Sequence, residues 1–125
     1  MHLRLLPDLF GVLKLEPPQA FPAWLNPAPI FFLARTEDEY SIMCPQDMIP
    51  EGVIYAADYR CLPVDGDLAF DEIGVVARVS KPLADAGLSL FLVSTHDRDY
   101  VLVRQADLET ALATYRTAGF TISEV

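Results

Sequence analysis

The sequence predicts an α+β protein made of two ferredoxin-like βαββαβ units with antiparallel sheets, and three observations support this. Residues 59–125 follow the order strand, helix, strand, strand, helix, strand, which is the ferredoxin-like arrangement. Residues 106–119 carry apolar side chains at helical spacing before a glycine. Residues 1–58 repeat the strand pattern with loops in place of the helices. We therefore expect a degenerate N-terminal unit over 1–58 and a complete C-terminal unit over 59–125.

The start of the C-terminal half reads as a strand followed by a helix. The stretch "YRCLPVDGDLAF" (59–70) favours a strand with a turn or bulge at its Asp-Gly pair, residues 65–66. A helix is expected over about 71–86, because an aspartate can cap its start and Gly87 can end it in a left-handed conformation. Pro82 lacks a backbone N–H and should loosen the last turn.

The remaining elements of this half follow in order. The segment "LSLFLVST" (88–95) is apolar on both faces, which is typical of a central strand covered on two sides. A turn at 96–99 leads to a second strand over 100–104. The amphipathic helix 106–119 and a last strand over 120–125 complete the unit.

The N-terminal half lacks regular helices. A long strand is expected over 3–15, and residues 16–29 hold half of the ten prolines and so form no regular helix. A hairpin over 30–44 and a strand over 53–62 follow. The proline-rich stretch is either an arm packed on the sheet or a docking loop, and Trp24 would be exposed in the second case. Its apolar residues favour the packed arm.

Composition excludes several classes of partner. The chain has 18 acidic and 9 basic residues and a net charge of −9, with its lysines and arginines scattered singly. Nucleic acid and anionic membrane surfaces are therefore not expected as partners. No apolar run approaches the roughly 20 residues of a membrane helix, so we expect a cytoplasmic protein. Cys44 and Cys61 are too few and too far apart for a disulfide framework or a metal knuckle, and are expected to be buried free thiols.

Catalysis has little support in the sequence. The two histidines, His2 and His96, lie near the N-terminus and in an expected turn. A phosphate-binding loop, a dinucleotide fingerprint and a zinc-protease motif are all missing from the sequence. An enzyme would need His96 to hydrogen-bond a nucleophile. We expect no catalytic residue, no metal and no cofactor.

The segments "FDEIGVV" (70–76) and "STHDRDY" (94–100) form the most specific constellation. A strand end followed by a helix start leaves the N–H groups of residues 72–74 free to bind an anion. Asp97 and Asp99 offer carboxylates for an ammonium or guanidinium group. Together these groups suit a zwitterion, and an α-amino acid is the natural candidate. Alternatively, both aspartates only form the turn.

The same residues resemble a known family. Residues 70–103 resemble the ACT-domain proteins, in particular the subgroup of the cytosolic arginine sensors (CASTOR-like) and their small bacterial relatives with two ACT units per chain. The resemblance rests on Phe70, Asp71, Gly74 to Ala77, Pro82 to Ala84, Ala86, Ser94, Thr95, Asp99, Tyr100, Leu102 and Val103. It implies a non-catalytic regulatory module that binds an amino acid at an ACT interface.

The resemblance also implies a set of ligand-binding residues. These are Glu72, Ile73, Gly74, Val75, Thr95, His96, Arg98 and Asp99. In the sensors, the carboxylate matching Asp99 contacts the ligand and the glycine matching Gly74 leaves room for it. The sensors have aromatic residues where this chain has His96 and Arg98; because Arg98 would repel a guanidinium, an acidic or neutral amino acid is as plausible a ligand as arginine.

The resemblance bears on assembly as well. The sensors hold four units where this chain has two, so a homodimer is expected. The alternative function is a ligand-free dimerisation or protein-interaction module. A salt bridge from Arg98 to Asp97 or Asp99, filling the site with its own side chains, would favour that alternative.

Overall fold

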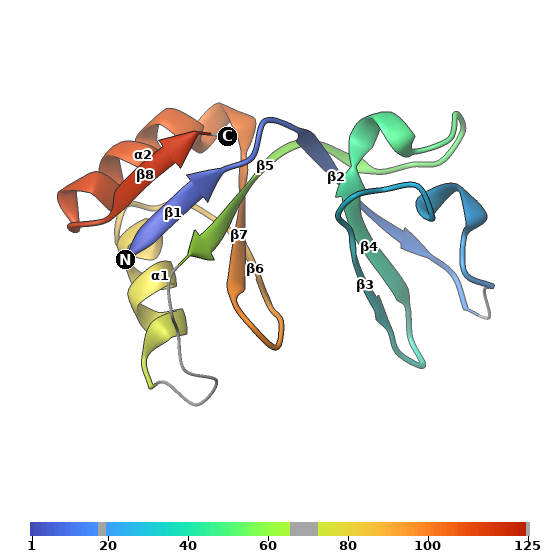
Figure 1. Cartoon of the computed structure of the whole chain (residues 1–125). Coiled ribbons are helices and arrows are strands. Elements are labelled where there is room, and N and C mark those ends of the chain that lie inside the picture. The colour runs from blue at the N-terminus through green and yellow to red at the C-terminus, as the bar shows by residue number, and fades with distance from the viewer. Residues whose placement is uncertain (18–19, 66–72, 125) are drawn as a thin grey trace. The chain divides into compact units, whose positions relative to one another are not determined.

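The computed structural model describes residues 1–17, 20–65 and 73–124. The chain forms two compact units (Figure 1). The N-terminal unit comprises residues 8–59, and the C-terminal unit comprises residues 1–7 together with 60–125. This division differs from the expected one at 58/59, because the first seven residues belong to the C-terminal unit.

The C-terminal unit has a sheet in the order β6-β7-β5-β1-β8. Its strands are β1 (His2–Leu5), β5 (Ala56–Asp65, which begins in the N-terminal unit), β6 (Phe91–Ser94), β7 (Asp99–Arg104) and β8 (Thr121–Glu124). Its helices are α1 (Val75–Asp85) and α2 (Leu108–Thr117), the latter preceded by the short 3-10 turn η3 (Gln105–Asp107). The element order from β5 to β8 confirms the predicted ferredoxin-like fold.

Strand β1 lies between the first and last strands of this ferredoxin-like unit. It pairs antiparallel with β5, with Leu3 opposite Val64, and parallel with β8, with Leu3 opposite Ile122. Pro7 follows two residues after the end of β1 and cannot donate to a sheet ladder. The expected single strand over 3–15 is therefore broken into β1 and β2, which belong to different units.

The core of the C-terminal unit lies between its sheet and its two helices, which cover one face of the sheet (Figure 1). Alternate strand residues point into this core: Leu3 and Leu5 of β1, Leu62 and Val64 of β5, Val101 and Val103 of β7, and Ile122 of β8. They meet Val75, Val79 and Leu83 of α1 and Ala111, Leu112 and Tyr115 of α2. The Tyr115 hydroxyl donates a 2.7 Å hydrogen bond to the Val79 carbonyl and so ties α2 to α1.

Helix α1 begins later than the sequence suggested. Gly74 is its N-cap, with a left-handed φ of 85°, and therefore lies just outside the helix rather than within its first turn. Gly87 has a φ of 77°, which confirms the predicted left-handed stop. Pro82 lies in the last turn, three residues before the helix ends. The expected cap Asp71 and Gly66 of the predicted turn lie outside the described residues.

The prediction of a central strand over 88–95 is wrong in position. Strand β6 lies at the end of the strand order of its unit and pairs with β7. Leu88, Leu90 and Leu92 pack against the helix-covered core, while Phe91 is partly exposed. A strand that is apolar on both faces is therefore an edge strand of this unit.

The N-terminal unit has a sheet in the order β3-β4-β2-β5. Its further elements are β2 (Leu9–Leu15), β3 (Phe32–Arg35), β4 (Tyr40–Pro45) and the 3-10 turns η1 (Ala23–Leu25) and η2 (Gln46–Met48). The β3–β4 pairing confirms the predicted hairpin. Leu25 is fully buried and Trp24 packs against the same core, so the described part of 16–29 is a packed arm.

Both cysteines are buried and free, as predicted. Burial raises the pKa of the Cys44 thiol to about 11 and that of Cys61 to about 12. Neither thiol is ionised near neutral pH, so neither is an activated nucleophile. Among the described residues, no helix combines the length and the apolar character that crossing a membrane requires.

The position of β1 predicts a difference between two leucines. Leu3 is 0% exposed and Leu9 is 37% exposed, so Leu3→Ala should lower the free energy of unfolding by about 2–5 kcal/mol, and Leu9→Ala by much less. Urea unfolding of the full chain measures both. Equal losses in the two variants would show that β1 does not complete the core.

Candidate ligand-binding site

Four of the predicted ligand residues lie on the β6–β7 hairpin. Ser94 pairs with Asp99 across the two strands. The backbone N–H and the hydroxyl of Thr95 both donate to the Arg98 carbonyl at 2.9 Å. The Arg98 N–H donates back to the Thr95 hydroxyl at 3.3 Å. The Thr95 side chain therefore closes the turn, which is a structural role for this predicted ligand residue.

His96 and Asp97 lie at the exposed end of this hairpin. Nδ1 of His96 is 2.8 Å from Oδ1 of Asp97, and this contact lowers the pKa of the Asp97 carboxyl. Both side chains are largely exposed. Nδ1 of His96 thus faces the carboxylate of the next residue in an exposed turn.

Arg98 extends from the hairpin to the end of β5. Its Nη1 donates to Oδ1 of Asp65 at 2.6 Å. Arg4 of β1 donates to the same carboxylate, from Nε at 2.9 Å and from Nη2 at 3.4 Å. The hydrogen bond from Arg4 lowers the pKa of Asp65, and the same bond raises the pKa of Arg4. Arg98 therefore forms its salt bridge with Asp65, and not with Asp97 or Asp99, the pairing that would have favoured the ligand-free alternative.

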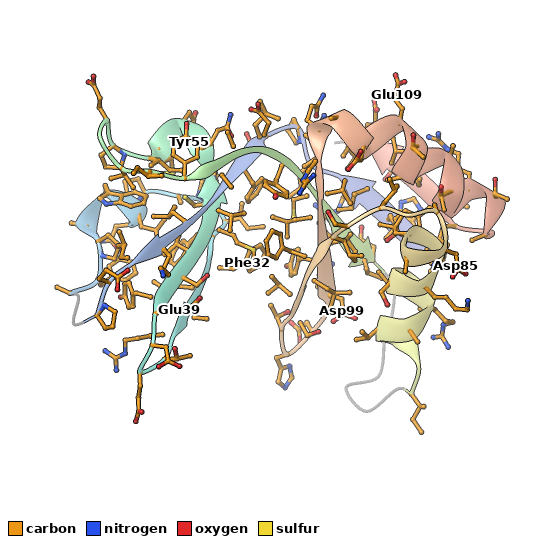
Figure 2. The ribbon with its side chains drawn as sticks, turned by 180° about the vertical axis from the view of Figure 1, so that it is seen from behind. Phe32, Glu39, Tyr55, Asp85, Asp99 and Glu109 are labelled. Carbon is orange, nitrogen blue, oxygen red and sulfur yellow. The ribbon has the colours of Figure 1, made fainter. Side chains whose placement is uncertain are left out.

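Asp99 has the one buried charged side chain among the described residues, with 8% exposed. It starts β7 at the hairpin end (Figure 2). By strand alternation it lies on the same face as Val101 and Val103, which is the face covered by the helices. No described residue forms a hydrogen bond to its carboxylate. Its carboxylate oxygens still reach solvent, because Nε of Arg60 is the fully buried side-chain polar atom without a hydrogen-bond partner among the described residues.

The other predicted ligand residues lie at the start of α1. Ile73 is exposed, whereas Val75 is buried in the core, so the Val75 side chain is directed away from a surface ligand. The first helical bond runs from the Arg78 N–H to the Gly74 carbonyl at 3.0 Å. The N–H groups that precede this bond are therefore those of residues 75–77, shifted from the expected 72–74. Glu72 lies outside the described residues.

The described ligand residues that the sequence predicted fall into two sets. The structure brings Thr95, His96, Arg98 and Asp99 onto one hairpin, and it brings Ile73, Gly74 and Val75 to the start of one helix. No hydrogen bond between these two sets occurs among the described residues. Nor do those residues include a cluster of metal-ligating side chains.

The sequence did not indicate the pairing of Arg4 with Asp65, which was expected to form a turn or bulge with Gly66. Arg4 was assigned to the other unit, and its pairing depends on the insertion of β1 beside β5. The one available signal was the alternation of apolar and polar residues in "HLRL" (2–5), which places Arg4 on the face opposite its leucines.

Two family models match consecutive parts of the chain. A model of the ACT domain matches residues 55–116, which cover β5 to α2 of the C-terminal unit. The chain belongs to the ACT-domain family. A separate model, described as an N-terminal domain, matches residues 8–52 of the N-terminal unit. The ACT domain thus follows a unit that matches a different family model. That the N-terminal unit is a degenerate ACT unit stays a prediction.

Two solved structures are similar to the chain over nearly its whole length. A protein from Agrobacterium tumefaciens is 36% identical, with a TM-score of 0.93 over 99% of this chain and 92% of that one. A protein of unknown function from Vibrio cholerae, described as a possible transport protein, is 16% identical, with a TM-score of 0.78 over 94% of this chain and 88% of that one.

A regulatory subunit of a kinase has a similar fold. The regulatory subunit of aspartate kinase from Thermus thermophilus, in its ligand-free form, is 14% identical, with a TM-score of 0.61 over 88% of this chain and 91% of that one. At this identity the likeness concerns the fold alone. The ferredoxin-like ACT fold of this chain therefore occurs in a protein with a regulatory role.

The Asp65 network predicts a pH dependence. Because its folded-state pKa is lowered, Asp65 stabilises the fold above its unfolded-state pKa of about 3.9 and loses this contribution as pH falls through the folded value. With its partial exposure, the network should contribute about 1 kcal/mol. The free energy of unfolding of Asp65→Asn should therefore fall less than that of the wild type on acidification.

Urea unfolding at a series of pH values measures this effect. Asp38→Asn removes an exposed aspartate of the N-terminal unit and should follow the wild-type curve. Parallel curves for the wild type and Asp65→Asn would contradict the stabilising role of the network.

Proposed function

We propose that this chain is a non-catalytic regulatory module whose ACT domain binds a small zwitterion, namely an amino acid. The observation that carries the proposal is Asp99, a residue that is only 8% exposed and whose carboxylate has no hydrogen-bond partner among the described residues. An α-ammonium group would complete it with a charge-assisted hydrogen bond. Asp99 also occupies the position at which the resemblance to the arginine sensors places a ligand contact.

The start of α1 would bind the carboxylate group of the amino acid. Gly74 has no side chain to cap the helix, and no side chain of the described residues caps it, which supports binding of a carboxylate at the first N–H groups of α1. A Cβ at Gly74 would meet Arg78 Nη1 at 3.7 Å, an ordinary contact. A glycine is therefore favoured at position 74 by the left-handed backbone conformation, and not by a lack of space for a side chain.

The pairing of Arg98 changes the expectation for the ligand. Asp65 takes up part of the positive charge that was expected to repel a guanidinium. Arginine, acidic and neutral amino acids therefore all belong in a ligand screen. Because binding can shift a conformation only through differential affinity, a regulatory effect would require a ligand-dependent change in assembly or in a partner surface.

A thermal-shift screen against the standard amino acids at millimolar concentration tests the proposal. A ligand at 100 times its dissociation constant adds about 2.7 kcal/mol of stability, which is a shift of several degrees for a chain of this size. Asp99→Asn should weaken binding of the hit by about 10- to 100-fold, as expected for a lost charge-assisted bond.

Asp97→Asn is the matched control, because Asp97 is two residues away and largely exposed. It should bind the hit as the wild type does. A screen without hits, or equal affinity in the Asp99 and Asp97 variants, would overturn the amino-acid site and leave a ligand-free dimerisation or interaction module.

We further propose that the chain acts as a homodimer, since a second copy would supply the four-unit arrangement of the sensors. Sedimentation velocity over a range of protein concentrations should show a species of twice the 13.9 kDa chain mass. A monomer at all concentrations, with and without the hit from the screen, would contradict this assembly.

A further inference from the structure

We propose that the face of the C-terminal sheet opposite the helices binds a small oxyanion through Arg4 and Arg98, at a site separate from Asp99. The helices and the apolar core occupy one face of this sheet. The residues that alternate with the core leucines, valines and isoleucine lie on the other face. Along β1, β5 and β8 these residues are His2, Arg4, Asp65, Thr121 and Ser123.

These residues form a continuous polar row across three strands. In β8, Thr121 Oγ1 and Ser123 Oγ lie 2.6 Å and 2.8 Å from the two ring nitrogens of His2. In β5, Asp65 accepts from Arg4 of β1 and from Arg98 of the hairpin. The row therefore extends from β8 to the β6–β7 hairpin within a single unit.

The row carries excess positive charge. Two guanidinium groups share one carboxylate, and the lowered pKa of Asp65 keeps that carboxylate ionised at neutral pH. These three side chains alone therefore have one positive charge in excess, in a chain whose net charge is −9. The exposed Asp97 carboxylate, whose pKa is lowered by His96 and also by Arg98, offsets part of that charge. The side chains of Arg4, Arg98 and Asp65 are 36%, 34% and 26% exposed, so the excess charge is partly desolvated yet accessible. A charge in this setting attracts an anion more strongly than one in open solvent.

The arginines are also held in place for a ligand. Arg4 donates to Asp65 through Nε and Nη2, and Arg98 donates through Nη1. The remaining guanidinium N–H groups, at Nη1 of Arg4 and at Nε and Nη2 of Arg98, form no hydrogen bond to the described residues. The common carboxylate fixes two donor groups from different elements side by side, which lowers the entropy cost of binding. Guanidinium groups arranged in this way favour carboxylate or phosphate oxygens.

The strand alternation separates this site from Asp99. Asp99 lies on the helix-covered face with Val101 and Val103, whereas Asp65 and Arg4 lie on the opposite face. The oxyanion site therefore does not depend on the proposed amino-acid site. Its ligand would be a small molecule or group with a phosphate or a carboxylate.

The test uses inorganic phosphate and malonate as separate probes, titrated into the full chain by calorimetry at constant ionic strength set with sodium chloride. Wild type should bind at least one of the two. Binding of phosphate alone would indicate a phosphate ligand, and binding of malonate alone would indicate a carboxylate. Failure of both probes to bind at millimolar concentration would overturn the proposal.

Variants locate the binding. Arg4→Gln and Arg98→Gln should each weaken binding at least tenfold, as expected for the loss of a charge-assisted bond. Arg104→Gln is the matched control, because it removes the same charge from an exposed residue at the end of β7. Equal weakening in all three variants would show general electrostatic attraction and would overturn the site.

Two further variants keep the result interpretable. Asp99→Asn should leave binding of the probe unchanged. If this variant no longer binds the probe, the two sites are one. If Arg98→Gln unfolds the chain, Arg98→Lys keeps the charge without the planar fork and should retain part of the affinity. Unchanged affinity in Arg98→Lys and Arg4→Lys would contradict recognition by the guanidinium fork.

Discussion

The insertion of β1 between β5 and β8 is the constraint on which the rest of the C-terminal unit depends. Leu3 is opposite Val64 on one side and Ile122 on the other, and together with Leu5 it lies in the core beneath the helices. The same alternation that places these leucines in the core places His2 and Arg4 on the other face. One short strand thus supplies part of the hydrophobic core and part of the polar row.

The local elements of the C-terminal unit were predictable because their signals are local. The amphipathic pattern of α2, the left-handed glycine after α1 and the hairpin turn each depend on residues that are close in sequence. The position of β1 was not predictable in the same way, since strand pairing between residues 2–5 and 121–124 leaves no local pattern. The edge position of β6 was missed for a related reason: apolarity on both faces indicates burial, but it does not identify the neighbouring strand.

The candidate site was predictable in part. Family resemblance and turn chemistry both indicated Asp99 and the hairpin, and the structure adds that Asp99 is buried while His96 and Asp97 are exposed. The roles of Thr95 and Arg98 required coordinates, because a threonine that closes a turn and one that binds a ligand have the same sequence context. The partner of Arg98, Asp65, is 33 residues away in sequence. The sequence therefore indicates that Arg98 would repel a ligand guanidinium, but it does not indicate the Asp65 carboxylate that offsets this charge.

The pairing of β1 with β8 also has a consequence for the order in which the chain folds. His2 and Thr121 are 119 positions apart and yet contact one another, so this sheet cannot close until residues 121–124 have been synthesised. The N-terminal unit, whose strands come from residues 9–59, has no such requirement. Contacts of such long sequence separation slow folding, because their loop-closure entropy is lost before the contacts form. During synthesis, residues 8–59 are therefore free to fold first, and β1 can pair with β5 before β8 is present to complete the sheet.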